Sequence, residues 1–263
     1  MKLSIVIPVY NEELHLPDII ALLHEAPCPI DREFIFINDC SSDRSGKILE
    51  ELKSKYNYQL IQLLHNEGKG FAVIEGIKVA KGDFIMIQDA DFEYDPYDVP
   101  PLVQLLVNDE ADVAFGSRFK KNAPQVHRTY HYFVNRFLTL LSNLLSGIYL
   151  TDMETCYKVF RADLLQSMQL KSKRFGIEIE LTAFIAKTSA RILELPIHYY
   201  PRSQLQGKKI NWKDGVAALF HLLRFNTFTS MEEAFKKLPE RYLPGQNAHH
   251  YKWKQATSPH KKS

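Results

Sequence analysis

The first half of the chain alternates short apolar runs with longer segments in which apolar residues recur at helical spacing. The apolar runs, bounded by glycine, proline or polar residues, predict strands at 3–9, 33–38, 59–64, 83–88 and 111–115. The segments between them predict helices at 12–25, 43–56, 70–80 and 98–108. Strands that alternate with helices of this length are typical of βαβ units. The pattern therefore predicts an α/β fold with a mainly parallel sheet flanked by helices.

The pattern changes in the second half, where a long stretch lacks acidic residues. Residues 113–151 contain no Asp or Glu, whereas the basic residues there are Arg118, Lys120, Lys121, Arg128 and Arg136. One apolar helical face predicts an amphipathic helix near 133–148, and it comprises Phe133, Phe137, Leu140, Leu141, Leu144, Leu145 and Ile148. Such a face either packs on the sheet or lies on a membrane, and the absence of acids favours an anionic partner. A second acid-free segment, 195–213, precedes another apolar helix at about 214–225.

Composition is that of a folded domain and identifies no partner by itself. The chain has 263 residues, of which 45% are hydrophobic, and a formal net charge of +2, so it can bury a sizeable core. Its three cysteines, Cys28, Cys40 and Cys156, lack metal-ligand spacing, which predicts free thiols in a reducing compartment. Met1 and Lys2 lead directly into the first predicted strand, so we expect no signal peptide. No apolar stretch reaches the ~18 residues that a membrane span requires.

The C-terminal end has the composition of a loosely structured tail. After Phe235 the chain contains three prolines, and from His249 onward it contains four lysines and no acidic residue. We therefore predict a folded domain at 1–228 and a C-terminal extension at 229–263, which is largely disordered from about residue 240.

Two carboxylates follow the fourth predicted strand. Asp89 and Asp91 flank Ala90 directly after the apolar run 84–87, and ligands of open α/β sheets bind outside the carboxyl ends of strands. Hard oxygen ligands suit Mg²⁺ or Mn²⁺, and these ions usually carry a substrate's phosphates. The motif therefore indicates a nucleotide diphosphate site. Because Asp is also common in turns and helix caps, this short motif alone does not decide its role.

Polar residues also follow the first two predicted strands, at the same edge of the sheet. Tyr10 and Glu12 follow the first strand, and Asp39 follows the second. Tyr10 can lie along a base or a ribose, and the two carboxylates can accept hydrogen bonds from either group; their alternative role is helix N-capping. The segment 65–70 is interpreted as a turn that brings Lys69 near the base. Together these loops predict a nucleotide-binding crevice.

Eight segments carry the pattern of a known enzyme family. They are LSIVIPVYNEE (3–13), INDCSSD (37–43), HNEGKG (65–70), QDADFEYDP (88–96), FGSRF (115–119), TDMETCYKVFR (151–161), RFGIEIEL (174–181) and YYPRSQLQGKKINWKDG (199–215). In this order they resemble the inverting family 2 glycosyltransferases, and the later segments are similar to their polyprenyl-phosphate branch, which includes the dolichol-phosphate mannosyltransferases. The resemblance covers residues 3–225 and implies the Rossmann-like GT-A fold, with a mixed, mainly parallel sheet and C-terminal amphipathic helices. Asn38-Asp39-Cys40 departs from the family's usual Asp-Asp-Gly, which leaves the preferred base open.

The resemblance implies a role for each matching residue. The nucleoside would contact Pro8, Tyr10, Glu12, Ile37 and Asp39. The donor diphosphate would contact Asp89, Ala90, Asp91, Arg202 and Lys208. Mg²⁺ or Mn²⁺ would be bound by Asp89, Asp91 and Glu93. The acceptor phosphate would be held by Arg118 together with Arg128 or Arg136. The catalytic residues would be Asp91, Arg118, Arg202 and Lys208.

The same resemblance implies transfer of a sugar, with inversion, from a nucleotide-sugar donor to a polyprenyl phosphate such as dolichyl or undecaprenyl phosphate. GDP-mannose is the first choice of donor, and UDP-glucose is the alternative. Because the lipid acceptor stays in the bilayer, we expect 113–151 and 195–225 to face the acceptor or the membrane. We expect a cytoplasmic protein that is peripherally bound to the cytoplasmic face of a membrane, directly or through a membrane-protein partner, and that binds no nucleic acid.

The sequence leaves two alternatives open. The same fold could act on a soluble glycan acceptor, whose hydroxyl a carboxylate base must deprotonate. Asp152 and Glu154 lie where such a base could sit, whereas the late pair Arg202 and Lys208 favours the lipid phosphate. The chain could instead be a non-catalytic module that binds a nucleotide sugar or a lipid, although the presence of Asp91 together with that basic pair argues against this alternative.

Overall fold

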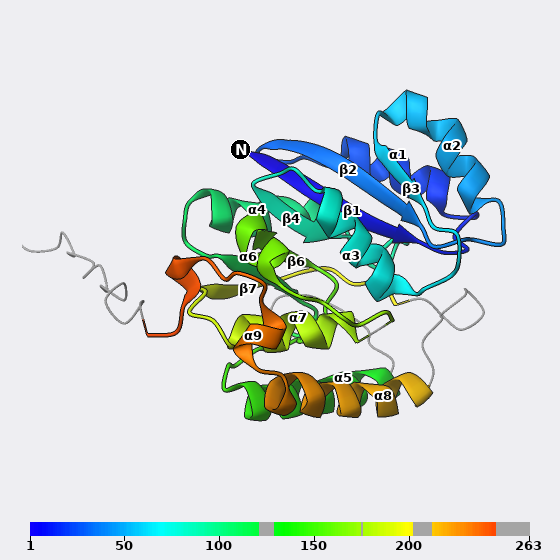
Figure 1. The fold of residues 1–263 in the computed structure, drawn as a ribbon. Helices are drawn as coiled ribbons and strands as arrows, with labels where there is room; N and C mark the ends of the chain where they lie inside the picture. The colour runs from blue at the N-terminus through cyan, green and yellow to red at the C-terminus, as the bar shows by residue number, and fades with distance from the viewer. Residues whose placement is uncertain (121–128, 175, 202–211, 246–263) are drawn as a thin grey trace, which may run out of the picture.

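A mixed sheet forms the centre of the molecule (Figure 1). The computed structural model describes residues 1–120, 129–174, 176–201 and 212–245. Over these ranges the chain forms a seven-stranded sheet in the order β3-β2-β1-β4-β6-β5-β7. The strands are β1 (Lys2–Val9), β2 (Asp31–Asn38), β3 (Gln59–Gln62), β4 (Phe84–Ile87), β5 (Val113–Ser117), β6 (Lys158–Arg161) and β7 (Ile192–Pro196). The α-helices are α1 (Leu16–Glu25), α2 (Ser45–Tyr56), α3 (Lys69–Val79), α4 (Val99–Val107), α5 (Thr129–Ser146), α6 (Ala162–Ser167), α7 (Ile177–Ala186), α8 (Trp212–Leu223) and α9 (Met231–Ala234).

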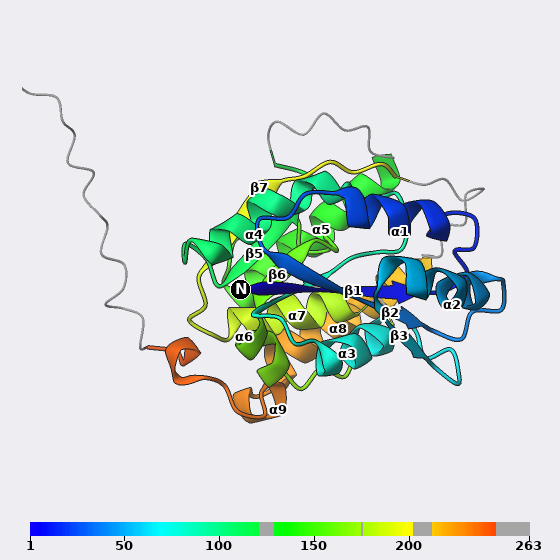
Figure 2. The same cartoon turned by 90° about the horizontal axis from the view of Figure 1, so that it is seen from above.

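The N-terminal half of the sheet has the predicted βαβ arrangement. β1 pairs in parallel with β2 on one side and with β4 on the other, and β2 pairs in parallel with β3. The five predicted strands all form, with ends that differ from the prediction by one or two residues. Figure 2 shows α1 on one side of β1 and α3 on the other, and the residues of β4 are buried accordingly. The carboxyl ends of β1, β2 and β4 therefore lie together at one edge.

The C-terminal half of the sheet departs from simple alternation. β6 lies between β4 and β5 and is antiparallel to both, and β7 adds in parallel to β5 at the edge. Neither β6 nor β7 was predicted from the sequence. The insertion of β6 brings the segment before it, residues 152–157, beside the end of β4, where the amide of Cys156 donates to the hydroxyl of Tyr94 at 3.0 Å.

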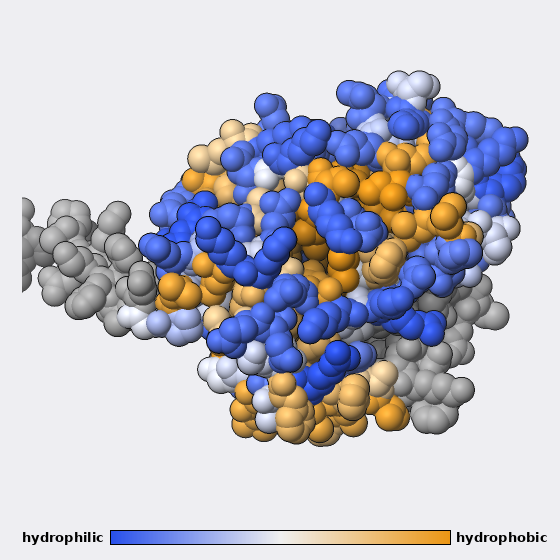
Figure 3. All heavy atoms as spheres, in the orientation of Figure 1, coloured by the Kyte–Doolittle hydropathy of each residue, from blue (hydrophilic) through white to orange (hydrophobic). Residues whose placement is uncertain are grey.

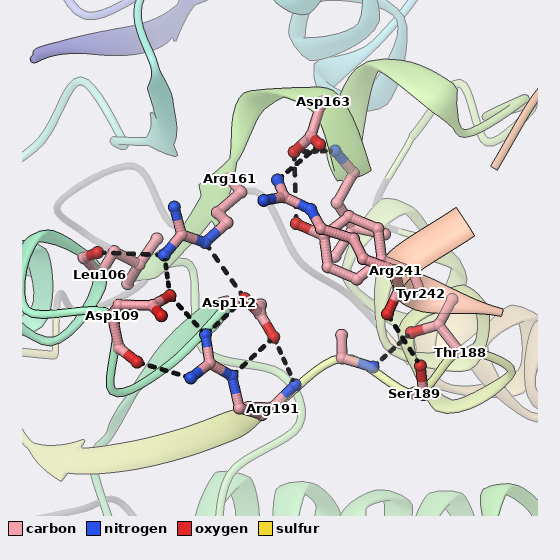
Figure 4. A network of polar contacts seen from close by, with 12 residues as sticks. Leu106, Asp109, Asp112, Arg161, Asp163, Thr188, Ser189, Arg191, Arg241 and Tyr242 are labelled. Atoms are coloured by element: carbon pink, nitrogen blue, oxygen red, sulfur yellow. Dashed lines mark hydrogen bonds and ion pairs between the residues drawn. The ribbon is translucent and has the colours of Figure 1, made fainter. Parts of the chain in front are cut away.

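An arginine–aspartate network joins this half of the sheet to the turn after α4 (Figure 4). Asp112 accepts hydrogen bonds from Arg161 at 3.1 Å and from Arg191 at 2.9 Å, and both arginines also pair with Asp109. Burial would raise the pKa of Asp112, but the hydrogen bonds from Arg191 and Arg161 outweigh burial and lower it. The network fixes the starts of β5 and β7 to the end of the antiparallel strand β6, at the edge of the sheet opposite the carboxyl ends of β1, β2 and β4.

The C-terminal extension is ordered further than the sequence analysis predicted. Residues 240–242 form the short helix η4 (Glu240–Tyr242), and Tyr242 is buried. Its hydroxyl donates to Asp163 at 3.2 Å, and its carbonyl accepts from the amide of Ser189 at 3.0 Å (Figure 4). The prediction of disorder from about residue 240 is thus wrong for 240–242, because this aromatic side chain has a buried site on the domain. Residues 246–263 lie outside the described part of the chain.

Candidate active site

The predicted nucleoside loops are joined to each other at the edge of the sheet. The amide of Asp39 donates to the carbonyl of Val9 at 2.8 Å, and the amide of Asn11 donates to the hydroxyl of Ser41 at 3.1 Å. The loop after β1 and the loop after β2 are therefore held side by side. As a result the predicted nucleoside residues Tyr10 and Glu12 lie next to the loop of Asp39, as the sequence analysis expected of strand ends in a parallel sheet.

Asp39 organises the turn that leads into α3. Its two carboxylate oxygens accept the amides of Glu67 and Gly68, each at 2.8 Å. Gly68 has φ of +99°, a conformation that residues with a Cβ rarely adopt, and a Cβ there would lie 2.5 Å from the carbonyl oxygen of Lys173. Burial raises the pKa of Asp39. Each of its oxygens keeps a second lone pair for a ligand.

Pro8 and Ile37 lie near the ends of β1 and β2, just before the predicted nucleoside loops. The two residues are partners in the β1–β2 ladder. Ile37 is fully buried, and α3 approaches it so closely that a Cβ on Gly76 would lie 2.8 Å from its Cδ1. The side chain of Ile37 therefore belongs to the core, and its part in nucleoside binding stays a prediction.

Lys69 joins two carboxylates that are distant in the sequence. Its Nζ lies 2.8 Å from Asp89 Oδ1 and 2.8 Å from Glu178 Oε1, and the three side chains are 17%, 22% and 8% exposed. Burial disfavours the ammonium, but the charges of Asp89 and Glu178 outweigh it and raise the pKa of Lys69. The sequence analysis placed Lys69 near the base and did not predict a role for Glu178. The structure shows Lys69 as the counter-ion of the first carboxylate of the Asp-Ala-Asp motif.

Asp91 and Glu93 occupy one tight turn after β4. Asp91 is buried and accepts the amide of Glu93 at 2.9 Å, while Glu93 Oε2 accepts the hydroxyl of Tyr199 at 3.0 Å. Among the residues that the structure describes, no three His, Cys, Asp or Glu side chains form a ready-made metal cluster. Carboxylate oxygens oriented by neighbouring donors nevertheless fit the chemistry of Mg²⁺ or Mn²⁺. The ligand set Asp89, Asp91 and Glu93 therefore stays a prediction.

Arg118 forms a buried, two-pronged ion pair with Asp152. Its Nε lies 2.7 Å from Oδ2 and its Nη2 lies 2.8 Å from Oδ1, and the two side chains are 7% and 0% exposed. The amide of Arg118 also donates to Oδ2 at 3.0 Å. Asp152 is thus paired with a guanidinium in the structure, which argues against its sequence-based interpretation as a possible general base for a soluble acceptor.

Arg118 and Arg136 face the same aromatic ring. Their guanidinium carbons lie 5.5 Å and 5.8 Å from the ring centroid of Phe119. Arg136, which is exposed on α5, donates to the carbonyl of Thr151 at 3.0 Å. Two of the three predicted acceptor-phosphate arginines are therefore brought together. The third, Arg128, and the predicted diphosphate residues Arg202 and Lys208 lie outside the described residues.

Glu154 interacts electrostatically with members of both ion pairs. Burial and the charge of Glu178 raise the pKa of Glu154 to about 7, whereas Lys158 and Arg118 favour its charged form. Its Oε1 is buried and has no hydrogen-bond partner within the described part of the structure. Lys158 donates to the carbonyls of Met153 and Thr155, and burial lowers its pKa. A carboxylate whose pKa lies near the operating pH, as that of Glu154 does, suits the role of a general base.

The predicted apolar face of α5 points outward. Phe133, Phe137 and Leu144 are 64%, 53% and 72% exposed, whereas the polar Thr139 and Ser142 are buried. The helix α8 packs beside α5 and adds the exposed apolar residues Val216, Leu219, Phe220 and Leu223. Figure 3 shows this apolar surface at the lower end of the molecule. The sequence left two roles open for this face of α5, packing on the sheet or contact with a membrane. Packing on the sheet is wrong for Phe133, Phe137 and Leu144, because these side chains are exposed.

Comparison with known proteins identifies the family. Residues 4–168 match the family model described as glycosyl transferase family 2, so the chain belongs to that family. It is 28% identical over 217 residues to a protein named dolichol-phosphate mannosyltransferase from Pyrococcus furiosus, and the match covers 80% of this chain and 61% of that protein. It is also 28% identical over 242 residues to a UDP-N-acetylglucosamine–dolichyl-phosphate N-acetylglucosaminyltransferase from Methanococcus voltae, with 83% and 94% covered.

Solved structures confirm the fold. Glucosyl-3-phosphoglycerate synthase from Mycobacterium tuberculosis in complex with phosphoglyceric acid superposes with a TM-score of 0.66 at 17% identity, over 86% of this chain and 80% of that one. S. aureus TarS 1–349 in complex with UDP-GlcNAc superposes with a TM-score of 0.57 at 19% identity, over 88% and 69%. The fold is therefore the GT-A fold expected from the sequence. Among residues 1–120, 129–174, 176–201 and 212–245, no helix is long and apolar enough to cross a membrane.

Proposed function

We propose that the protein transfers a sugar from a nucleotide-sugar donor to the phosphate of a polyprenyl phosphate. The observation that carries this proposal is the position of Arg136 on α5, next to Arg118 and on the same helix as the exposed apolar face. An acceptor that fits both features must combine an anionic head with a long apolar chain. A lipid phosphate has this chemistry, and a soluble glycan does not.

The donor side uses the loops at the carboxyl ends of β1, β2 and β4. Tyr10, Glu12 and Asp39 would bind the nucleoside, and Asp91 with Glu93 and Asp89 would hold the divalent cation beside the diphosphate. A bound Mg²⁺ or Mn²⁺ would neutralise charge on the departing diphosphate. A structure of the mycobacterial synthase with Mn²⁺ and UDP bound supports a cation for this fold.

The reaction needs no strong general base. An acceptor phosphate oxygen, already anionic at pH 7, forms the new bond to the anomeric carbon while the bond from that carbon to the diphosphate oxygen breaks. The leaving nucleoside diphosphate takes the electron pair, and attack from the opposite face inverts the configuration. Arg118 and Arg136 would orient the acceptor phosphate, and Arg202 and Lys208 would stabilise the leaving group. Positioning and electrostatics then supply most of the rate.

GDP-mannose is the proposed donor, with UDP-sugars as the alternative. The name of the Pyrococcus relative supports mannose, and the name of the Methanococcus relative supports a UDP-linked sugar. The acceptor lies in a bilayer, so the protein would bind peripherally at the cytoplasmic face of a membrane through the apolar face of α5 and α8, alone or with a membrane-protein partner.

One observation favours a second candidate, transfer to the hydroxyl of a soluble acceptor. The pKa of Glu154, raised to about 7, suits a general base. In that reaction Glu154→Gln would abolish transfer, whereas transfer to a lipid phosphate would continue because its nucleophile is already ionised.

A donor and acceptor screen tests the proposal. GDP-mannose, UDP-glucose and UDP-N-acetylglucosamine are each combined with a polyprenyl phosphate or a free glycan, in the presence of Mg²⁺ or Mn²⁺. We expect one donor to yield a glycosylated lipid phosphate, and we expect Asp91→Ala to abolish the product while the melting temperature is retained. Glycosylation of the glycan alone would favour the Glu154 mechanism. Nucleotide binding without turnover of any donor would favour a non-catalytic module.

A further inference from the structure

Tyr199 lies where the donor side and the acceptor side of the candidate site meet. It follows β7, is buried, and forms an antiparallel bridge with Tyr94. The amide of the next residue, Tyr200, donates to the carbonyl of Glu93 at 2.8 Å. The segment after β7 is thereby fastened to the turn that carries the predicted metal ligands Asp91 and Glu93.

The hydroxyl of Tyr199 contacts the donor side. It donates to Oε2 of Glu93 at 3.0 Å. A hydrogen bond of this kind fixes the orientation of a carboxylate and so determines where its lone pairs point. Removal of such an orienting partner from a metal ligand typically weakens metal binding about 10–100-fold. Glu93, whose carboxylate accepts the hydroxyl of Tyr199, has the geometry of a metal ligand that is oriented by a neighbouring hydrogen-bond donor.

The ring of Tyr199 contacts the acceptor side. The guanidinium carbon of Arg118 lies 5.0 Å from its centroid, within the range of a cation–π interaction. The ring also packs against Tyr94 at 5.2 Å, which stacks on Tyr157 at 4.8 Å. The hydroxyl of Tyr157 donates to Gln88 at 2.8 Å, immediately before the Asp-Ala-Asp motif. A column of buried tyrosines thus runs between the motif and Arg118.

We propose that Tyr199 is a positioning residue with two roles. Its hydroxyl orients Glu93 toward the divalent cation, and its ring holds Arg118 at a fixed distance from Glu93. The inference rests on the proposed function, because it takes Glu93 as a metal ligand and Arg118 as a ligand of the acceptor. A tyrosine suits this place since its polar end and its flat face serve two partners at once. The distance between the reacting groups of donor and acceptor would then depend on one rigid side chain.

Tyr199→Phe separates the two contacts, because it removes the hydroxyl and keeps the ring under Arg118. We expect the dissociation constant for Mn²⁺, measured by electron paramagnetic resonance on the protein without donor, to rise about 10-fold or more. The melting temperature without Mn²⁺ is expected to stay close to that of the wild type. The KM for polyprenyl phosphate is expected to be unchanged. Tyr199→Leu removes both contacts and is expected to raise that KM as well.

Tyr200→Phe is the matched control, since Tyr200 is the neighbouring tyrosine and its side chain is exposed. It is expected to leave Mn²⁺ binding unchanged. Equal Mn²⁺ affinity of Tyr199→Phe and the wild type would overturn the proposal while leaving the transfer function standing. Weak Mn²⁺ binding by Tyr199→Phe in a protein that glycosylates only soluble acceptors would support the role of Tyr199 and reject the lipid acceptor. A wild type that binds no Mn²⁺ would overturn both the metal assignment and this role.

Discussion

The ammonium of Lys69 lies 2.8 Å from the carboxylate of Asp89, the first acidic residue of the motif at the end of β4. Because Glu178 holds the same ammonium from the other side, α3 and α7 are tied to the loop after β4 by one cation. The candidate donor site therefore combines charges from three elements, and Lys69 compensates part of its negative charge.

The Lys69–Glu178 pair is expected to contribute measurably to folding. In a double-mutant cycle with Lys69→Met and Glu178→Gln, we expect a coupling energy of about 1–3 kcal/mol in urea unfolding, because the pair is largely enclosed. Lys78→Met with Glu75→Gln, an exposed pair on the same helix, is the control and is expected to give about 0.2–0.5 kcal/mol. Equal coupling in the two cycles would refute the structural role of Lys69.

Asp152→Asn should destabilise the fold strongly. The substitution leaves the buried guanidinium of Arg118 without its counter-ion, and breaking a buried pair typically costs about 3–5 kcal/mol. The free energy of unfolding at neutral pH measures this effect. Asp163→Asn, which breaks the exposed pair with Arg241, is expected to cost less than about 1 kcal/mol. A loss from Asp152→Asn no larger than the loss from Asp163→Asn would contradict the buried geometry.

Glu154 should make the protein less stable as pH rises. Its pKa of about 7 in the folded state exceeds its ordinary value, so the folded protein holds a proton that the unfolded chain releases. The stabilising contribution is present below about pH 4.5 and is lost as pH rises through 7. Between pH 4.5 and 8 the free energy of unfolding of Glu154→Gln, measured in urea, should therefore rise by about 3 kcal/mol relative to that of the wild type.

The control for this pH profile is Glu25→Gln, at the exposed end of α1. The free energy of unfolding of this variant is expected to follow that of the wild type at every pH. A Glu154→Gln profile that also runs parallel to the wild type would show that the environment of Glu154 does not hold its proton.

Much of the fold could be predicted from the sequence, because the N-terminal half consists of local units. The apolar runs of β1, β2 and β4 lie between turn residues, and each pairs with a strand from a neighbouring βαβ unit. β6 was missed because it is four residues long and its partners come from distant segments. β7 was missed for a similar reason, since its single partner β5 lies about 80 residues earlier.

The candidate site shows the same division between local and distant contacts. Residues that follow strand ends, such as Asp39 and Asp91, could be predicted because the sheet edge gathers them. The partners of Asp89 and Glu93 could not, since Lys69, Glu178 and Tyr199 approach only through tertiary packing. The sequence signal for Glu178 and Tyr199 is their place in the late segments 174–181 and 199–215 of the family pattern, which indicate the family but imply no role for either residue.

The apolar face of α5 and α8 should mediate binding to lipid vesicles. Phe137→Asp and Leu144→Asp are each expected to weaken binding to anionic vesicles about tenfold or more, since burial of one large apolar side chain is worth about 1.5–3 kcal/mol. Both residues are exposed, so the melting temperature should not fall. Leu64→Asp, an exposed leucine in the loop after β3, is the control and is expected to bind normally. Unfolding of the α5 variants would contradict an exposed face.

The most direct test of the central claim compares three acceptors that differ in their nucleophile: a polyprenyl phosphate, the same polyprenol without its phosphate, and a soluble glycan. Each acceptor is incubated with GDP-mannose, Mg²⁺ and the protein of residues 1–263. The products are analysed by mass spectrometry. We predict one added hexose on the polyprenyl phosphate and no product from the other two acceptors. Glycosylation of the polyprenol or of the glycan, with no product from the polyprenyl phosphate, would contradict the account.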